Sequence, residues 1–487
     1  MCFRFPIVFR SLAAAALLST CAAAAQFHSG QAARAVIGQR SFSAKDAGID
    51  ATSLAISNGM LYASDVSGRV LTFDLRDLPG AKDDMAGEPA TACAICGLSP
   101  ASVVNQSVLP GIAAVSVHDR TVLIADTARR EVSIWRDVSS PQANNAPDII
   151  LTTVMQPVSV AFDGSRVFVG DAALHRVLVW NSIPIAGNQP PDAALGQPGD
   201  VAGPDTIGRP DALASDGVNL FVADGVNRRI LVFTAGDVPL ANGAIVNSAS
   251  LTTAPLAPGT LVTITGTSLS EGSKSAPDDG MHALPNKLAG VEVVFDGFAL
   301  PLLLAAPSEV RAQLPYDTGG ASSASLYVRT ERSDGSVTIT NAIALKLVPA
   351  SPGVFAFGGP EPRAGMLLHG QAGAPVTQDS PVHPGEVVTL WTTGLGLVDT
   401  GDPTKTVLPG IPYADLDAPV EIPVRATVNG IPAEVTSAVL PKGSIGVYEV
   451  RIVIPNGVEP DSSAQLFLMQ NGSISNTVTF PIGSTIQ

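Results

Sequence analysis

Four aspartates in the first half of the sequence recur in the same local setting and are the first candidates for chemistry. Each ends a short apolar run, and in three of the copies an arginine begins the next apolar run. Carboxylates that repeat around a common axis could form a ring of ligands for a metal ion or a substrate. The residues of this pattern are Asp65, Asp126, Asp171, Asp224, Arg69, Arg176 and Arg229.

The same pattern also has a structural interpretation. An aspartate at the end of a strand accepts backbone N–H groups in a tight turn, and the following arginine satisfies the carboxylate or a nearby carbonyl. A ligand site seldom needs the same residue in every copy, so the repetition favours the structural role. The second copy has Glu131 where the arginine is expected, beside Arg130. We therefore expect that copy to pack differently.

The cysteines Cys93 and Cys96 form the other close pair of reactive side chains, in the sequence ACAIC. A redox dithiol would be expected in a βαβ setting, and a zinc site would need two further ligands nearby. The flanking Thr, Ala, Gly and Pro residues suggest neither of these. In an oxidising compartment the pair is predicted to form a small local disulfide.

Motifs of other common chemistries are missing from the sequence. It contains no nucleophile elbow, phosphate-binding glycine loop, dinucleotide fingerprint or HExxH segment. The acidic pairs Asp83-Asp84 and Asp278-Asp279 lie in loops that could hold calcium, but they lack an alternating series of oxygen ligands. The sequence therefore predicts no catalytic residue and no cofactor, with calcium as the cation to test. The histidines are dispersed, and each is a turn or surface residue unless the fold gathers them: His28, His118, His175, His282, His369 and His383.

Composition and charge narrow the class of protein. The 487 residues carry a net charge of −15, which opposes binding to the phosphate backbone of nucleic acid. Apolar residues make up 46% and charged residues 15%, as in a globular chain. Gly and Pro are scattered among short Val-, Ile- and Thr-rich runs, a pattern that is typical of many strands joined by tight turns. We therefore predict an all-β protein.

The first 25 residues read as a secretory signal. Arg4 and Arg10 supply positive charge, an apolar run covers 11–22, and small residues precede Gln26. A lipoprotein signal acylated at Cys21 is the alternative, although Thr20 stands where such signals prefer Gly, Ala or Ser. No later run reaches the roughly 18 apolar residues that span a bilayer. We expect export to an extracellular, periplasmic or outer-surface location without a membrane span.

The aspartates belong to a repeated segment with the order strand, turn, strand, aspartate turn, strand. The copies read LYASDVSGRVLTF, VLIADTARREVSIW, VFVGDAALHRVLVW and LFVADGVNRRILVF. Their spacing suits one four-stranded β-propeller blade per copy. The pattern over 35–240 resembles the NHL-type repeat, which usually closes with six blades, so a propeller is expected over 27–240. Four copies instead of six leave three alternatives. The ring is small, or divergent strands lie in 27–50 and 81–109, or a partial ring packs against the C-terminal half of the chain.

A second internal repeat fills the rest of the chain. PGTLVTITGTSLS (258–270) returns as PGEVVTLWTTGLGL (384–397), and three further pieces return in the same order. The alternation of apolar and polar residues predicts two β-sandwiches, over 244–348 and 349–487. The Gly-Thr strand and the hairpins Asp296-Gly297 and Asn429-Gly430 resemble IPT/TIG immunoglobulin-like domains. Five motifs occur in order over 244–487 and together resemble the Solibacter-type C-terminal domain of exported acidobacterial proteins: IVNSASL, the PGTLVTITG strand, PASPGVF, TTGLGLV and SNTVTF.

These resemblances imply a function that the residues alone do not specify. We expect a secreted or envelope-associated, non-enzymatic binding or scaffold protein, with a protein or glycan at the cell surface as partner. The propeller loops would present the binding face. The alternative is an enzyme that uses the propeller channel, a calcium-dependent lactonase or a lyase, because related propellers host such chemistry. Fold analogy alone carries little functional weight.

Overall fold

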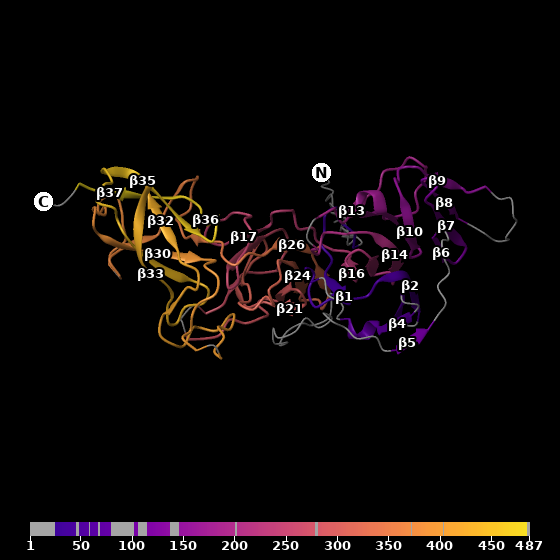
Figure 1. Ribbon diagram of the computed structural model, residues 1–487, viewed down its shortest axis with the longest axis horizontal. Coiled ribbons are helices and arrows are strands. Elements are labelled where there is room, and N and C mark those ends of the chain that lie inside the picture. Colours follow the sequence, from indigo (N-terminus) through magenta and orange to yellow (C-terminus); the bar gives the residue numbers. More distant parts are fainter. Residues whose placement is uncertain are drawn as a thin grey trace, which may run out of the picture.

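The computed structural model describes the chain at residues 25–44, 48–57, 59–66, 69–78, 102–105, 114–136, 146–199, 202–277, 281–371, 373–402 and 404–484 (Figure 1). Within these ranges the regular structure is β-strand, apart from the short 3-10 turns η1 (Leu75–Asp77) and η2 (Ala172–Leu174). The all-β prediction is confirmed. Among the described residues, no helix has the length and apolar character needed to cross a bilayer.

Four antiparallel sheets of four strands each form the N-terminal unit. The first contains β2 (Ala51–Ser57), β3 (Met60–Asp65), β4 (Arg69–Asp74) and β5 (Ser102–Asn105). The second contains β6 (Val115–His118), β7 (Thr121–Asp126), β8 (Glu131–Trp135) and β9 (Ile149–Leu151). The third contains β10 (Pro157–Phe162), β11 (Val167–Asp171), β12 (Arg176–Trp180) and β13 (Ala193–Leu195). The fourth contains β14 (Pro210–Ser215), β15 (Asn219–Asp224), β16 (Arg229–Thr234) and β1 (Ala35–Ile37).

The outer strands of two sheets come from the segments where the sequence suggests divergent strands. β5 lies within 81–109 and pairs with β4, while β1 lies within 27–50 and pairs with β16. Strand β1 precedes the other strands in sequence, yet it completes the last sheet. The two ends of the N-terminal unit are therefore joined by backbone hydrogen bonds.

The four sheets pack through their first strands and share cores. β14 contacts β2 and β10, and β10 contacts β6, so the first, fourth, third and second sheets follow one another through their first strands (Figure 1). Apolar side chains alternate or run continuously along these strands, and each pair of packed sheets encloses a cluster of them. These clusters contain Leu61 and Phe221 between the first and fourth sheets, Phe168 and Val222 between the third and fourth, and Ile134 and Trp180 between the second and third.

The second unit is two-layered. One sheet has the order β17-β18-β23-β22-β19, and the other has the order β21-β20-β24-β25 with β26 also paired to β24. A single hydrophobic cluster lies between them. The strands are β17 (Ile245–Asn247), β18 (Leu261–Thr265), β19 (Lys274–Ser275), β20 (Val291–Phe295), β21 (Phe298–Ala299), β22 (Leu302–Ala305), β23 (Glu309–Gln313), β24 (Ser323–Glu331), β25 (Val337–Ile339) and β26 (Ile343–Lys346).

The third unit is one 11-stranded sheet that curls around its own core. Strand β33 pairs with β32 through its first residues and with β34 through its later ones, so it belongs to both halves. Its strands are β27 (Gly353–Val354), β28 (Arg363–Ala364), β29 (Leu367–His369), β30 (Val387–Thr393), β31 (Ala418–Pro419), β32 (Arg425–Val428), β33 (Ile431–Leu440), β34 (Tyr448–Val453), β35 (Asp461–Gln470), β36 (Ser473–Ile474) and β37 (Val478–Ile482).

Hydrogen bonds of backbone and side-chain groups join the three units into an elongated molecule (Figure 1). Between the first and second units, Ala32 N–H donates to Ala342 O at 2.9 Å, and Asp237 N–H donates to Ile339 O at 2.8 Å. Asp237 Oδ2 accepts the Ile339 N–H in return at 3.0 Å. Between the second and third units, Arg363 Nη2 donates to Ala249 O and to Ser250 O, each at 2.9 Å.

Candidate functional site

The four repeated aspartates occupy one structural position. Each is the last residue of the second strand of its sheet, β3, β7, β11 or β15. In the third and fourth sheets the aspartate faces the arginine that begins the next strand, Asp171 opposite Arg176 and Asp224 opposite Arg229. In the second sheet Asp126 faces Glu131.

Asp224 and Arg229 form a fully buried ion pair. Both side chains are 0% exposed, and Arg229 Nε lies 3.0 Å from Asp224 Oδ2. Asp224 Oδ1 accepts the backbone N–H groups of Gly208 and Arg209 at 2.9 and 3.2 Å. Burial lowers the pKa of Arg229, and the charge of Asp224 opposes that shift. The carboxylate is thus occupied by internal donors.

Arg229 also ties two crossing segments to the fourth sheet. Its Nη1 donates to Phe42 O, and its Nη2 donates to Gly203 O at 3.0 Å and Thr206 O at 2.8 Å. A guanidinium presents five donors in a fixed fork, which suits this set of backbone acceptors. The arginine therefore acts as a structural clamp in this position.

In the other copies the aspartate ranges from buried to partly exposed. Asp171 is 0% exposed, lies 3.6 Å from Arg176 Nη2 and accepts the N–H of Gln156 at 3.0 Å. Asp126 is 34% exposed, accepts the N–H of Arg129 at 2.9 Å and lies 3.7 Å from Arg129 Nε. Asp65 is buried, and the side chain of Arg69 lies outside the described residues. Asp126, in the copy that has Glu131, is therefore more exposed than Asp171 and Asp224.

Hydrogen bonds between sheets place the aspartate turns on one surface, here called the turn face. It consists of turns 127–130, 172–175 and 225–228 and segments 48–50, 155–157 and 208–210. From the second to the third sheet, Thr127 Oγ1 donates to Pro157 O at 2.5 Å. The third sheet meets the fourth where His175 Nδ1 lies 2.6 Å from Gly208 O, and the fourth meets the first where Ile49 N–H donates to Arg228 O at 3.0 Å.

Two carboxylates of this face lie close to the same glycine. A Cβ placed on Gly225 would lie 2.1 Å from Asp211 Oδ2 and 3.4 Å from Asp50 Oδ1, so both carboxylates approach the same glycine. Burial raises the pKa of Asp211, with Arg209 opposing the shift and Asp50 adding to it. Arg209 Nε lies 2.8 Å from Asp211 Oδ1. Fewer than three such ligands converge here, and no group of three or more His, Cys, Asp or Glu side chains elsewhere in the described chain could hold a metal.

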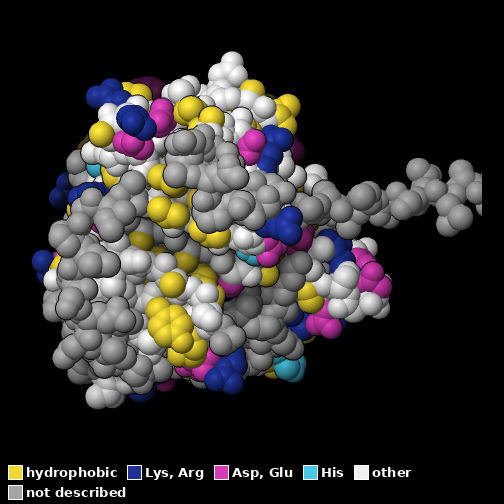
Figure 2. Space-filling model, turned by 90° about the vertical axis from the view of Figure 1, so that its right-hand side faces the viewer, with side chains coloured by type: hydrophobic (Ala, Val, Ile, Leu, Met, Phe, Trp, Pro, Cys, Tyr) yellow, Lys and Arg dark blue, Asp and Glu magenta, His cyan; other side chains and the backbone are white. Residues whose placement is uncertain are grey.

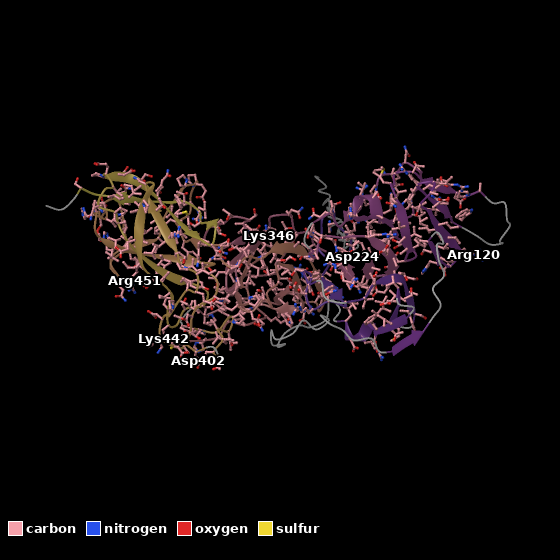
Figure 3. All side chains as sticks on the ribbon, viewed as in Figure 1. Arg120, Asp224, Lys346, Asp402, Lys442 and Arg451 are labelled. Atoms are coloured by element: carbon pink, nitrogen blue, oxygen red, sulfur yellow. The ribbon has the colours of Figure 1, made fainter. Side chains whose placement is uncertain are left out.

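Arginines stand on the same turns with their side chains in solvent. Arg129 is 75% exposed and Arg209 is 56% exposed. Arg130 and Arg228 are also exposed. Seen from the end formed by β6–β9, the surface shows basic and acidic side chains interspersed around its edge, with hydrophobic patches between them (Figure 2). Asp224 lies well inside the N-terminal unit, whereas Arg120, in the β6–β7 turn, lies at its outer end (Figure 3).

A cavity of about 360 Å³ lies where the second and third units meet. Pro258, Tyr316 and Leu347 line it from one side, and Leu397 and Glu421 line it from the other. The Tyr316 hydroxyl is hydrogen-bonded to that of Tyr448, and burial raises the pKa of Tyr316 to about 12. The hydroxyl groups are thus committed to the junction and not to the cavity.

The remaining residues singled out in the sequence are not gathered into one site. His369 Nδ1 lies 2.5 Å from Glu386 Oε1, and His383 Nδ1 lies 2.6 Å from Ser484 O, both in the third unit. Cys21, Cys93 and Cys96 lie outside the described residues, so the predicted disulfide and the acylation alternative stay predictions. Sequence reasoning missed the exposed arginines of the turn face and the cavity between units. The arginine-rich turn letters TARR and GVNRR carried a signal for the first, whereas the cavity depends on docking.

Comparisons with known proteins do not assign a family. No protein-family model and no curated protein matches the chain. Among solved structures, the computationally designed Ika8 protein is 12% identical at a TM-score of 0.19, covering 87% of this chain and 100% of that one. SGBP-B of the Bacteroides ovatus mixed-linkage glucan utilization locus, in complex with a mixed-linkage heptasaccharide, is 13% identical at a TM-score of 0.13, covering 48% of this chain and 44% of that one. Kuenenia stuttgartiensis hydrazine synthase is 11% identical at a TM-score of 0.17, covering 74% of each chain. Similarities at these TM-scores carry no argument about fold or function.

Proposed function

We propose that the chain is an exported binding protein. In this proposal the four N-terminal sheets are the blades of a small β-propeller, and its turn face binds a partner. The observation that supports the proposal is that the aspartate turns contain two kinds of residue, those that hold the turn together and those that are exposed at its tip. In the third and fourth sheets the aspartate and the arginine that begins the next strand hold the turn together, most completely in the buried pair Asp224 and Arg229. The side chains of the turn tips are left in solvent, where they are free to contact a ligand.

The propeller assignment is supported by how the unit closes. Strand β1 pairs with β16, so a strand from the start of the unit completes the last sheet. Such pairing removes a free sheet edge. The aspartate and arginine spacing resembles NHL-type repeats, and we propose that this chain carries a four-bladed version of that architecture.

The second and third units are proposed to be immunoglobulin-like sandwiches that carry the propeller. Their strands pair alike in the two copies: β18 with β23 and β30 with β34, then β20 with β24 and β32 with β35. This agreement supports the proposed duplication and the resemblance to IPT/TIG and Solibacter-type C-terminal domains. The hydrogen bonds between units make the pair a stiff support. We propose an extracellular, periplasmic or outer-surface location, with a protein or glycan at the cell surface as partner.

A blocking experiment tests the proposal. Ala128→Trp combined with Ala173→Trp places bulky side chains on two exposed turn tips, while Val218→Trp places one at the opposite end of the fourth sheet. Binding of the labelled protein to envelope material of the producing bacterium is compared for these variants and the wild type. We expect the turn-tip variant to lose most of its binding and Val218→Trp to keep it. Equal binding by all three proteins would contradict a turn-face site.

A calcium-dependent lactonase or lyase is the second candidate, favoured by Asp50 and Asp211. Their carboxylates face the same glycine, and Asp50 helps to raise the pKa of Asp211. A bound cation would relieve that repulsion. Two carboxylates are fewer than the roughly 6–8 oxygen ligands that calcium takes, so binding is the preferred function. A rise of the melting temperature with calcium that disappears in Asp211→Asn would favour the enzyme.

A further inference from the structure

The residue that precedes the third strand of a sheet has a left-handed backbone in three of the four sheets. Arg130 has φ 58°, His175 has φ 53° and Arg228 has φ 51°. In the first sheet the residue at this place in the sequence is Gly68. Left-handed backbone favours glycine or asparagine, and other residues adopt it at a cost in free energy.

The fold needs this backbone but does not need arginine. The carbonyl of Arg228 accepts the N–H of Ile49, which links the fourth sheet to the first. Glycine would present the same carbonyl without strain. The third copy uses its side chain internally, because His175 Nδ1 bonds Gly208 O. Arg130 and Arg228 have no such use, since neither guanidinium has a hydrogen bond or an ion pair with any described residue.

These two cations stand among other arginines of the turn face. Arg129, next to Arg130, makes two long contacts, 3.7 Å from its Nε to Asp126 Oδ2 and 3.9 Å from its Nη1 to Glu131 Oε1. Arg209 reaches the turn that contains Arg228, because the Gly225 N–H donates to Arg209 O at 3.3 Å. The chain as a whole carries a net charge of −15, with 43 Asp and Glu against 28 Lys and Arg. Arg209 is paired with Asp211 at 2.8 Å, so Arg130 and Arg228 are the turn-face arginines without a carboxylate partner among the described residues, on a molecule of net negative charge.

Resting on the proposed function, we infer that the turn face binds an acidic polysaccharide, with Arg130 and Arg228 as its main anion contacts and Arg129 and Arg209 beside them. Guanidinium groups bind carboxylate and sulfate groups through two parallel hydrogen bonds. Arg130 belongs to the second sheet and Arg228 to the fourth, with the third sheet packed between. A ligand that engages both is extended and repeats its charge, as a chain of uronic acid units does.

The test uses the full exported chain and oligogalacturonate as the probe. The binding-deficient variant is Arg130→Gly combined with Arg228→Gly, which should fold at least as well as the wild type because glycine prefers the left-handed backbone. Arg120→Gln is the matched control, since it removes an exposed cation from the opposite end of the second sheet. Affinity is measured by calorimetry, with galactose oligomers as the neutral probe and poly-glutamate as the acidic polypeptide probe. The melting temperature of every variant reports on folding.

The expected result is a loss of oligogalacturonate affinity of about tenfold for each arginine removed. The Arg120→Gln variant should bind oligogalacturonate as tightly as the wild type does. The neutral galactose oligomers should not bind. Affinity should also fall as salt is added, because exposed charges are screened. Equal affinity of the double variant and the wild type, or no binding by the wild type, would overturn the inference. Arginine-dependent binding of poly-glutamate alone would assign the face to an acidic protein and overturn the polysaccharide. If the turn-tip tryptophans block envelope binding while the double glycine variant does not, the proposed function stands and this inference fails.

Discussion

Asp224 and Arg229 show at the scale of single residues how the repeat is used. The carboxylate satisfies two backbone N–H groups and one guanidinium, and the guanidinium satisfies three carbonyls from two crossing segments. Removing one partner of a buried ion pair leaves the other charge without compensation. The same sequence position is much less demanding in the second sheet, where Asp126 and its arginine face solvent.

This contrast gives a stability prediction with an internal control. Asp224→Ala should lower the free energy of unfolding by about 3–5 kcal/mol, because Arg229 and two N–H groups lose their partner. Asp126→Ala should lower it by less than about 1 kcal/mol. Urea denaturation followed by circular dichroism measures both. Similar losses for the two variants would contradict the structural role assigned to the buried pair.

Asp296 gives a pH-dependent prediction. It sits at a hairpin with φ 48°, its Oδ1 accepts the Ser325 N–H at 2.6 Å, and burial raises its pKa to about 7. The equivalent Asn429 has φ 47° and accepts the Gln465 N–H at 2.7 Å. An amide thus fills the same role without a charge.

The sign of the effect follows from the raised pKa. The folded state holds the proton more tightly than the unfolded state, so the contribution of Asp296 is complete at low pH and is lost as pH rises from about 4 through 7. Asp296→Asn should be more stable than the wild type at pH 8, by about 1 kcal/mol or more, and nearly equal at pH 4. Unfolding curves at both pH values test this. A difference that does not change with pH would show that the carboxyl is not buried as described.

At the scale of elements, β1 fixes the boundary of the N-terminal unit. Val36 and Ile37 are 0% exposed, and the strand covers the edge of β16. A chain that starts after Ile37 should lose the cooperative unfolding of this unit and expose a strand edge that promotes aggregation. A chain that starts at Gln26 keeps β1 and should therefore keep the cooperative unfolding of this unit. Calorimetry and light scattering on both truncations decide the matter, and equal melting of the two would argue against the pairing.

The strands themselves are predictable because their signal is local. Alternating apolar residues and the tight turns between them define β11 and β15 without any distant contact. The sequence indicates β1 and β5 only as unnamed strands within longer segments, because each is short and is completed by a partner elsewhere in the chain. The equivalence of β18 with β30 is also readable, since both begin after the same Pro-Gly letters.

The candidate site is less predictable for a physical reason. The spacing of Asp171 and Arg176 reveals a recurring turn, but burial and partners decide whether such a carboxylate is a ligand or a cap. Burial and hydrogen-bond partners depend on crossing segments such as the one that contains Gly208. The exposed position of Arg228 follows from the same packing. The cavity beside Tyr316 depends on the docking of two units, for which no local sequence signal exists.

At the scale of the whole molecule, three tyrosines report on the junctions. Tyr327 packs with Ala32 where the first two units meet, and Tyr316 and Tyr448 are hydrogen-bonded to each other where the second and third meet. Burial raises the pKa of each, to about 12 for Tyr316 and well above its usual value for Tyr448. The junctions therefore shield phenol groups that ionise near pH 10 in water.

This shielding predicts a late alkaline titration. Absorbance at the phenolate band should show Tyr316, Tyr327 and Tyr448 ionising only as the structure opens, at a pH above the value near 10 of a phenol in water. Because the unfolded state releases these protons first, stability should fall as pH rises above about 10. The single variants Tyr316→Phe and Tyr448→Phe should each remove part of this late titration. Ionisation of all tyrosines in one step near pH 10 would contradict closed junctions.

We propose that the turn face of the N-terminal unit is the binding surface. Hydrogen–deuterium exchange on the full chain, with and without saturating oligogalacturonate, tests it most directly. We predict that the ligand slows exchange in 127–130, 172–175 and 225–228 and leaves the rest of the chain unchanged. Protection confined to the opposite turns at 119–120 and 216–218, or to the cavity around Tyr316 and Glu421, would contradict the account.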